Sequence, residues 1–230
     1  MTRQSIENTG DAEDVVTSGY SPDAIYERLK HDISVGNIAQ GAALIETQLA
    51  KRYDVSRTPI RQALMALEQD GLVSRNGRSL RVRSQTATEI MELYEVRELL
   101  EDRAAALAAR KRDDVDMAVL RRLLERMSSP ELDKGERYTL NREFHTAMWK
   151  AAHHAILLRT LERLYVNSVL GLTTTLAASE RWATTLEEHR AMVEAIAEGD
   201  DRQAVELVRS HLQTARDIRL TECIDREGSL

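Results

Sequence analysis

Apolar residues recur at helical spacing through most of the chain, and one short stretch has a different pattern. The first part contains three such helical segments, near 22–35, 46–53 and 57–70. Two short stretches typical of strands follow at 72–75 and 80–83, and the Asn76-Gly77 pair between them is typical of a tight hairpin turn. Three helices followed by a hairpin predict a winged helix-turn-helix.

From Thr86 onward the helical spacing continues to the end of the chain. Thr86 and Glu89 have the spacing of a capping box, which starts a helix. Breaks in the periodicity divide this part into six helices, near 87–111, 113–128, 133–152, 155–179, 181–198 and 201–224. We therefore expect a mainly α fold, with a winged helix-turn-helix followed by a six-helix antiparallel bundle. The expected boundaries are a disordered arm at 1–20, a first domain at 21–84 and a second at 85–230.

The composition fits this architecture and indicates the cellular compartment. Apolar residues make up 42% of the chain and aromatic residues only 4%, which suits an aliphatic helical core. No stretch approaches the roughly 18–20 apolar residues that a membrane span needs. Cys223 is the single cysteine, so no internal disulfide can form. We expect a cytoplasmic protein with no membrane partner.

The charge is distributed unevenly along the chain. The formal net charge is −6, yet residues 21–86 carry ten basic and seven acidic side chains. Arg57, Thr58 and Arg61 lie at the start of the third helix, away from its apolar stripe. The first turns of a recognition helix face base edges and phosphates in DNA, and arginine binds guanine bidentately. This segment therefore fits DNA binding, and it fits a solvated helix face with surface arginines equally well.

The same segment resembles a known family. Residues 56–64 read SRTPIRQAL and residues 67–73 read LEQDGLV, which is similar to the motif of the GntR family of bacterial transcription regulators. The resemblance implies that Arg57 and Arg61 contact operator DNA, that Thr58 supports them on phosphate and that Arg78 lies in the wing. Two positions depart from the family pattern. Ile45 replaces the usual Ser or Thr before the second helix, and Arg78-Ser79 replaces Arg-Gly at the wing tip.

The expected bundle has a charged residue on an apolar stripe. Arg97 lies in the middle of the inward face of the first bundle helix, between Leu93 and Leu100. A buried guanidinium without an anionic partner is very costly. Two partners are open at this point: an internal Asp or Glu, or the carboxylate of a bound ligand.

Three histidines also lie on inward faces. His189 and His211 are nearly equidistant from the turn at Gly199, about 15–17 Å along their helices, so antiparallel packing would bring them level. His145 lies mid-helix, and Asn141 precedes it by one turn on the same face. Each histidine alone is more typical of a satisfied core residue. Together, they also fit a divalent metal site with open positions.

The bundle resembles the FCD effector domain of the FadR subfamily of GntR regulators, in its VanR-like branch. The matching motifs are VRELLExxAA at 96–105, Asn141-x-x-Phe144-His145, Glu188-His189 and His211-Leu212. The resemblance implies a metal, zinc or nickel, held by His145, His189, His211 and the position of Asn141, where many members have Asp. It also implies a small organic acid bound near the metal, Arg97 and Asn141, and a homodimer on a palindromic operator.

These features together predict a DNA-binding transcription repressor that a small carboxylate effector releases from its operator. Two alternatives remain open. One is a helical metal-dependent enzyme, against which we find no inward carboxylate beside the three histidines that would act as an obvious general base. The other is a DNA-binding protein whose helical domain only dimerises. Effector-dependent release from operator DNA would distinguish the sensor from both.

Overall fold

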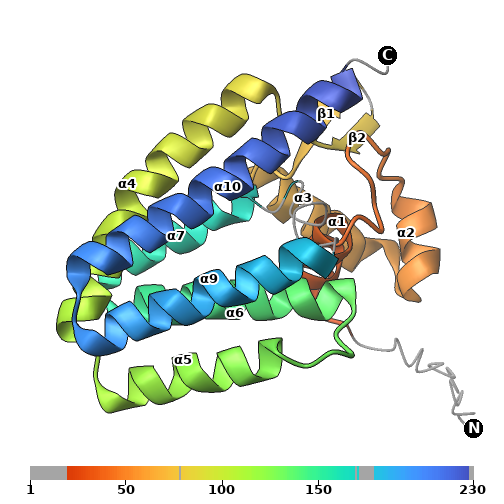
Figure 1. Ribbon diagram of the computed structural model, residues 1–230. Helices are drawn as coiled ribbons and strands as arrows, with labels where there is room; N and C mark the ends of the chain where they lie inside the picture. The colour runs from red at the N-terminus through yellow and green to blue at the C-terminus, as the bar shows by residue number, and fades with distance from the viewer. Residues whose placement is uncertain (1–19, 78, 169, 171–178, 228–230) are drawn as a thin grey trace, which may run out of the picture.

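The computed structural model describes residues 20–77, 79–168, 170 and 179–227. Its elements form a small N-terminal unit and a larger helical bundle (Figure 1). The N-terminal elements are α1 Pro22–Ser34, α2 Glu46–Tyr53, α3 Arg57–Gln69, β1 Val73–Asn76 and β2 Ser79–Val82. The bundle elements are α4 Ala87–Lys111, α5 Asp114–Met127, α6 Lys134–Ala151, α7 Ala155–Ser168, α9 Ser179–Glu198 and α10 Asp201–Glu227.

The N-terminal unit is the predicted winged helix-turn-helix. Ser21 caps α1 by accepting a hydrogen bond from the Ala24 N–H, and α3 packs against α1 over buried apolar side chains. Strands β1 and β2 pair antiparallel, with Gly77 in the turn at φ 61°, a value that glycine adopts without strain. The strands lie one residue nearer the turn than predicted. The expected arm at 1–20 lies outside the described residues except for its last position.

The second helix, α2, has no side-chain cap, which agrees with the replacement of the usual Ser or Thr by Ile45. Ile45 occupies the N-cap position of α2 and makes no side-chain capping hydrogen bond. The backbone N–H groups of Gln48 and Leu49 donate to the Ile45 carbonyl instead. Packing of Leu49 and Tyr53 into the core therefore holds α2 in place.

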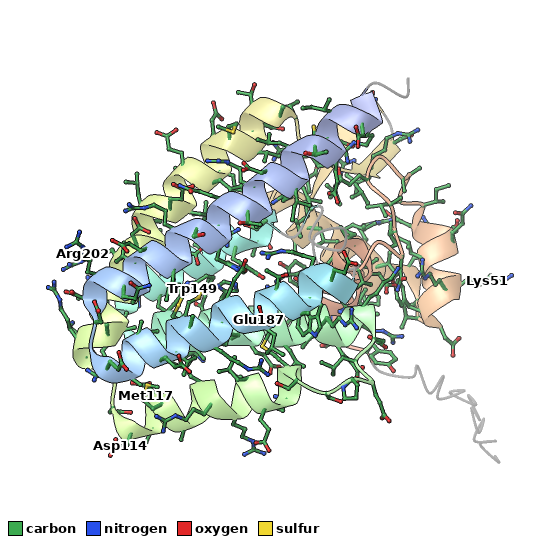
Figure 2. The ribbon with its side chains drawn as sticks, viewed as in Figure 1. Lys51, Asp114, Met117, Trp149, Glu187 and Arg202 are labelled. Carbon is green, nitrogen blue, oxygen red and sulfur yellow. The ribbon has the colours of Figure 1, made fainter. Side chains whose placement is uncertain are left out.

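The six predicted bundle helices correspond to α4, α5, α6, α7, α9 and α10. Complete capping boxes begin α4, α5 and α6, so the starts of these helices are fixed by local hydrogen bonds. Figure 1 shows α10 alongside α4 and α5 on the outer side, and α5 packs against both α6 and α9. Trp149 lies between the helices in Figure 2, whereas Lys51 and Arg202 project from the surface.

The predicted bundle boundaries agree with the structure to within about two residues, except at the end of α10 and in a segment that lies outside the described residues. Helix α10 continues to residue 227, beyond the predicted end at 224. Residues 169 and 171–178, which the sequence analysis placed in a helix ending at 179, lie outside the described residues. None of the helices in the described part of the chain is long and apolar enough to cross a membrane.

A buried polar junction joins the two parts of the molecule at Gln85, just before α4. The Gln85 Nε2 donates to the backbone carbonyl of Asn167 at 3.2 Å, and the guanidinium of Arg219 donates to Gln85 Oε1. Arg219 is only 3% exposed and also reaches the Ser168 carbonyl at 3.4 Å. Helices α7 and α10 therefore hold the connection between the winged helix-turn-helix and the bundle.

Candidate effector and DNA-binding sites

The structure brings His145, His189 and His211 together in the interior of the bundle. They come from α6, α9 and α10, and their exposed fractions are 1%, 0% and 6%. One nitrogen of each ring lies within 4.8 Å of the other two. His189 and His211, which the sequence placed level across the Gly199 turn, have ring centroids 5.0 Å apart. The distances from His145 to each of them are 5.2 Å.

Several polar atoms at this cluster have no hydrogen-bond partner among the described residues. They are both ring nitrogens of His189, Nδ1 of His145 and Oδ1 of Asn141, which is 4% exposed and lies one turn before His145. Buried polar atoms without partners are costly, and native proteins satisfy the great majority of them. The nitrogens of His189 and the oxygen of Asn141 therefore mark a place where a ligand or metal ion would be stabilised.

The protonation state of the cluster suits metal binding. Burial lowers the pKa of His189 well below its ordinary value, and the nearby His211 and His145 lower it further. Burial also lowers the pKa of His211, against the opposing effect of Glu188. Neutral imidazoles are the form that binds divalent metals. The donor set therefore fits the zinc or nickel that the sequence resemblance implied.

A buried carboxylate lies beside the histidines, so the sequence-based expectation that none does so was wrong. Glu101 is fully buried, and its Oε2 lies 3.6 Å from Nδ1 of His145. Trp149 Nε1 donates to the same oxygen at 3.2 Å. Glu101 is one turn after Arg97 on α4. Its contact with His145 could not be predicted from the spacing along the chain, because His145 belongs to a different helix, α6.

Arg97 has an internal anionic partner, the carboxylate of Glu101. Its Nε and Nη2 lie 2.9 and 2.8 Å from Glu101 Oε1. The guanidinium also lies over the rings of Tyr94 and Tyr165, at 5.0 and 5.6 Å from their centroids. Burial raises the pKa of Glu101, but the charge and hydrogen bonds of Arg97 and the nearby His145 together outweigh burial and hold the pKa at about 2.

This geometry decides between the two partners that the sequence left open for Arg97. The internal acid is present, so an effector seated directly on Arg97 would have to displace Glu101. The expectation that Arg97 itself binds the effector is therefore corrected. Arg97 stabilises the negative charge of Glu101, which in turn faces His145.

A second carboxylate orients His211. The Oε2 of Glu188 lies 2.5 Å from Nδ1 of His211, and Arg181 binds both Glu188 oxygens at 2.7 and 3.0 Å. Burial raises the pKa of Glu188, but its hydrogen bonds with His211 and Arg181 hold that pKa at about 2. A carboxylate that accepts from one imidazole nitrogen leaves the other nitrogen for a ligand. Nε2 of His211 is therefore the nitrogen available to the cluster.

The predicted DNA-reading residues lie at the exposed start of α3. The side chains of Arg57 and Arg61 are 60% and 59% exposed, and Thr58 is exposed between them. Both arginines bind Glu46 at the start of α2, at 3.1 and 2.9 Å. These hydrogen bonds, from Arg61 and then Arg57, lower the pKa of Glu46 to about 2. Arg78 lies outside the described residues.

Glu46 is a functional candidate that sequence reasoning missed. It follows Ile45 directly and reads as an acid in the first turn of a helix. Only the packing of α2 against α3 shows that its carboxylate meets Arg57 and Arg61. A fixed anion on these two exposed cations holds their side chains in place and would compete with an anionic partner for them.

Comparison with known proteins finds a family match for the helical bundle and another for the winged helix-turn-helix. The FCD domain family matches residues 92–214, and the family of bacterial regulatory proteins named gntR matches residues 22–81. An HTH-type transcriptional regulator of Bacillus subtilis (strain 168), YdhC, is 33% identical over 195 residues, covering 81% of this chain and 85% of the relative. The Escherichia coli (strain K12) transcriptional repressor GlaR is 29% identical over 200 residues, covering 82% and 91%.

A solved structure extends this likeness to the fold. The structure of E. coli McbR/YncC superposes with a TM-score of 0.76 at 26% identity, and the match covers 87% of this chain and 97% of that one. Fold and relatives together define a DNA-binding transcription regulator with a helical FCD domain, and these relatives are regulators and not enzymes. The chain belongs to the gntR family of bacterial regulatory proteins, within the group that carries an FCD domain.

Proposed function

We propose that this regulator is a homodimeric repressor that holds a divalent metal at His145, His189 and His211 and leaves its operator when a small carboxylate binds there. The observation that carries the proposal is the close group of three buried imidazoles, in which neither ring nitrogen of His189 has a hydrogen-bond partner among the described residues. The name of the similar E. coli protein, a repressor, supports the direction of control.

The histidine cluster supplies three imidazole ligands, and Asn141 supplies a side-chain amide as a fourth group. Imidazole nitrogen suits zinc and nickel. Once bound, such an ion would act as a Lewis acid and accept the oxygens of an anionic ligand. Glu188 bonds to Nδ1 of His211 and orients that imidazole without occupying a ligand position, and Glu101 faces Nδ1 of His145 at 3.6 Å.

The donor set of three imidazoles and one amide contains no carboxylate, which favours an anionic effector. An Asp at position 141 would offset part of the charge of the ion, but Asn141 leaves that charge to be balanced by the ligand. Arg97 does not compete for this ligand, since it is already paired with Glu101. A small mono- or dicarboxylate would complete the charge balance and satisfy Oδ1 or Nδ2 of Asn141 by hydrogen bonding.

The DNA contacts are proposed at Arg57, Thr58 and Arg61. Their place in the first turns of α3 matches that of a recognition helix in the major groove. Binding would exchange the ion pairs with Glu46 for contacts to guanine or phosphate. Such exposed ion pairs contribute little stability, so the exchange costs little. A homodimer would present two of these helices to a palindromic operator.

The two sites are connected through α10. His211 and Arg219 lie about two turns apart on this helix. Arg219 donates a hydrogen bond to Gln85, which lies in the connection to the DNA-binding unit. A second connection runs through side chains, because Arg97 and Arg219 both lie over the ring of Tyr94, at 5.0 and 5.7 Å. A ligand that moves α10 at His211 would therefore displace the junction at Gln85.

Operator binding of zinc-loaded protein, measured by fluorescence anisotropy with a panel of small carboxylates, tests this function. We expect at least one acid to release the wild type but not a His189→Ala/His211→Ala variant. The His153→Ala variant, which removes a surface histidine paired with Asp116, is the matched control and should respond normally. Equal release of the wild type and the double variant would refute sensing at the histidine cluster.

A further inference from the structure

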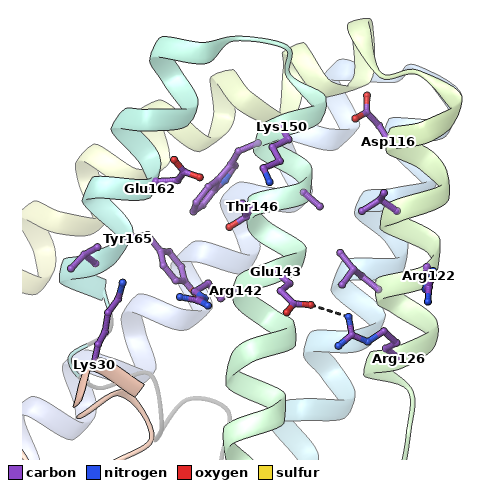
Figure 3. A pocket seen from close by; sticks show the side chains of 15 residues that line it. Lys30, Asp116, Arg122, Arg126, Arg142, Glu143, Thr146, Lys150, Glu162 and Tyr165 are labelled. Carbon is purple, nitrogen blue, oxygen red and sulfur yellow. Dashed lines mark hydrogen bonds and ion pairs between the residues drawn. The ribbon is translucent and has the colours of Figure 1, made fainter. Parts of the chain in front are cut away.

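A groove lies on the outer side of the bundle, apart from the histidine cluster. It is a groove of 690 Å³ between α5, α6 and α7, and Lys30 of α1 closes one end (Figure 3). Pockets that bind small molecules typically have volumes of about 300–1,000 Å³. The groove therefore has the size of a ligand site and touches both the bundle and the DNA-binding unit.

The floor of the groove is aromatic and apolar. Trp149 and Tyr165 line it with their ring centroids 5.5 Å apart and their planes at 69°, and Val119, Leu123 and Val166 surround them. Trp149 and Tyr165 are also neighbours of His145, at ring distances of 6.1 and 6.4 Å. These two rings therefore form the wall between the groove and the histidine cluster.

The rim of the groove carries more positive than negative charge. Its cations are Lys30, Arg122, Arg126, Arg142 and Lys150, and its acids are Asp116, Glu143 and Glu162. Two of the acids are already engaged, since Glu143 binds Arg126 at 3.0 Å and Asp116 binds His153 at 2.8 Å.

The excess is greatest at the end near α1. Lys30 and Arg142 share the single, half-exposed carboxylate of Glu27, at 3.5 and 3.8 Å. Figure 3 shows Lys30, Arg142 and Tyr165 at this same end of the groove. Two cations with one distant carboxylate, beside an aromatic floor, are complementary to an anionic group attached to a flat apolar body.

We propose that this groove is a second ligand site, for an aromatic carboxylate or similar aromatic anion. The ring would lie against Trp149 and Tyr165, and the anionic group would lie between Lys30 of α1 and Arg142 of α6. The occupant would thus link the DNA-binding unit to the bundle. This site requires no metal and differs from the histidine cluster in both its residues and its ligand chemistry.

The test uses the full chain and 8-anilinonaphthalene-1-sulfonate, a fluorescent aromatic anion. We expect one saturable site per chain, with benzoate competing for it. The Lys30→Gln/Arg142→Gln variant should bind the probe more weakly by about tenfold or more, because it loses two charge-assisted contacts. Arg121→Gln, which removes an α5 charge outside the groove, is the matched control and should bind normally. Ala147→Phe, which fills the groove without changing its charge, should also weaken binding.

The His189→Ala/His211→Ala variant separates this proposal from the proposed function. It should keep probe binding, since neither histidine lines the groove. Loss of binding in that variant, with normal binding in the groove variants, would place the probe at the histidines and overturn the proposal. So would non-saturable binding, or a change in the monomer–dimer equilibrium of the groove variants in ultracentrifugation, which would make the groove a subunit interface.

Discussion

Arg97 and Glu101 form a fully buried ion pair one helical turn apart on α4, with Nη2 and Oε1 separated by 2.8 Å. Removing one partner of such a pair leaves a buried charge without compensation. Arg97→Met should therefore lower the free energy of unfolding by about 3–5 kcal/mol. Chemical denaturation followed by circular dichroism measures this loss.

The double variant Arg97→Met/Glu101→Gln supplies the control for that prediction. It removes both charges but keeps an oxygen to accept from Trp149 Nε1, so it should recover most of the lost stability. The exposed pair of Arg202 and Glu206 on α10 has the same i,i+4 spacing, and Arg202→Met should change stability little. If Arg97→Met is as stable as the wild type, the buried pair is not what holds Glu101 ionised.

The residues at the start of α3 provide the second prediction. Arg57→Ala or Arg61→Ala should weaken specific operator binding by about tenfold to a hundredfold per half-site, because each removes a base or phosphate contact. Gel-shift titration at fixed salt measures the change. The fold should be intact, since both side chains are exposed. Arg202→Ala, on the far end of the bundle, should bind operator normally, and unchanged affinity of the α3 variants would remove this helix from the interface.

Glu46 gives the third prediction, in which a substitution increases operator affinity. Its pKa, held at about 2 by Arg61 and Arg57, keeps it ionised throughout the pH range of DNA binding. Glu46→Gln should free both arginines and modestly increase operator affinity, with a steeper dependence on salt. Glu206→Gln makes the same charge change far from α3 and should have little effect. Weaker operator binding by Glu46→Gln would instead show that Glu46 orients the arginines for DNA.

The sequence predicted most of the fold and the core of the site, for identifiable reasons. The three short helices and the hairpin are bounded by residues with local effects, such as the N-cap Ser21 and the turn residue Gly77. His189 and His211 could be paired because helical rise and one turn fix their relative height. The contacts of Glu101 with His145, of Glu46 with Arg57 and of Arg219 with Gln85 depend on how separate helices pack. Spacing along the chain does not determine that packing.

Asn141 gives the fourth prediction. Asn141→Asp should tighten metal binding, because it adds a negative ligand at a buried position beside His145. The same change should destabilise the metal-free protein, because it buries an uncompensated charge. Competition with a chelator and thermal melting with and without zinc measure the two effects. A variant that is equally stable without metal and binds it no more tightly would place position 141 outside the ligand set.

The junction at Gln85 gives the fifth prediction. Arg219→Met removes the donor to Gln85 and should weaken the coupling between the histidine cluster and the DNA-binding unit. Zinc should slow hydrogen exchange around residues 85–90 in the wild type but not in this variant, although zinc still binds. Arg209→Met, which loses only an exposed pair with Asp102, should behave as the wild type. Normal zinc-dependent protection in Arg219→Met would exclude this route.

Metal content tests the central claim most directly. Protein loaded with zinc or nickel, desalted and examined by native mass spectrometry should hold one ion per chain in the wild type and in His153→Ala. The His189→Ala/His211→Ala variant should hold none, and its melting temperature should no longer respond to added metal. If the wild type retains no more metal than the double variant, the three histidines are polar core residues and the proposed sensor mechanism is wrong.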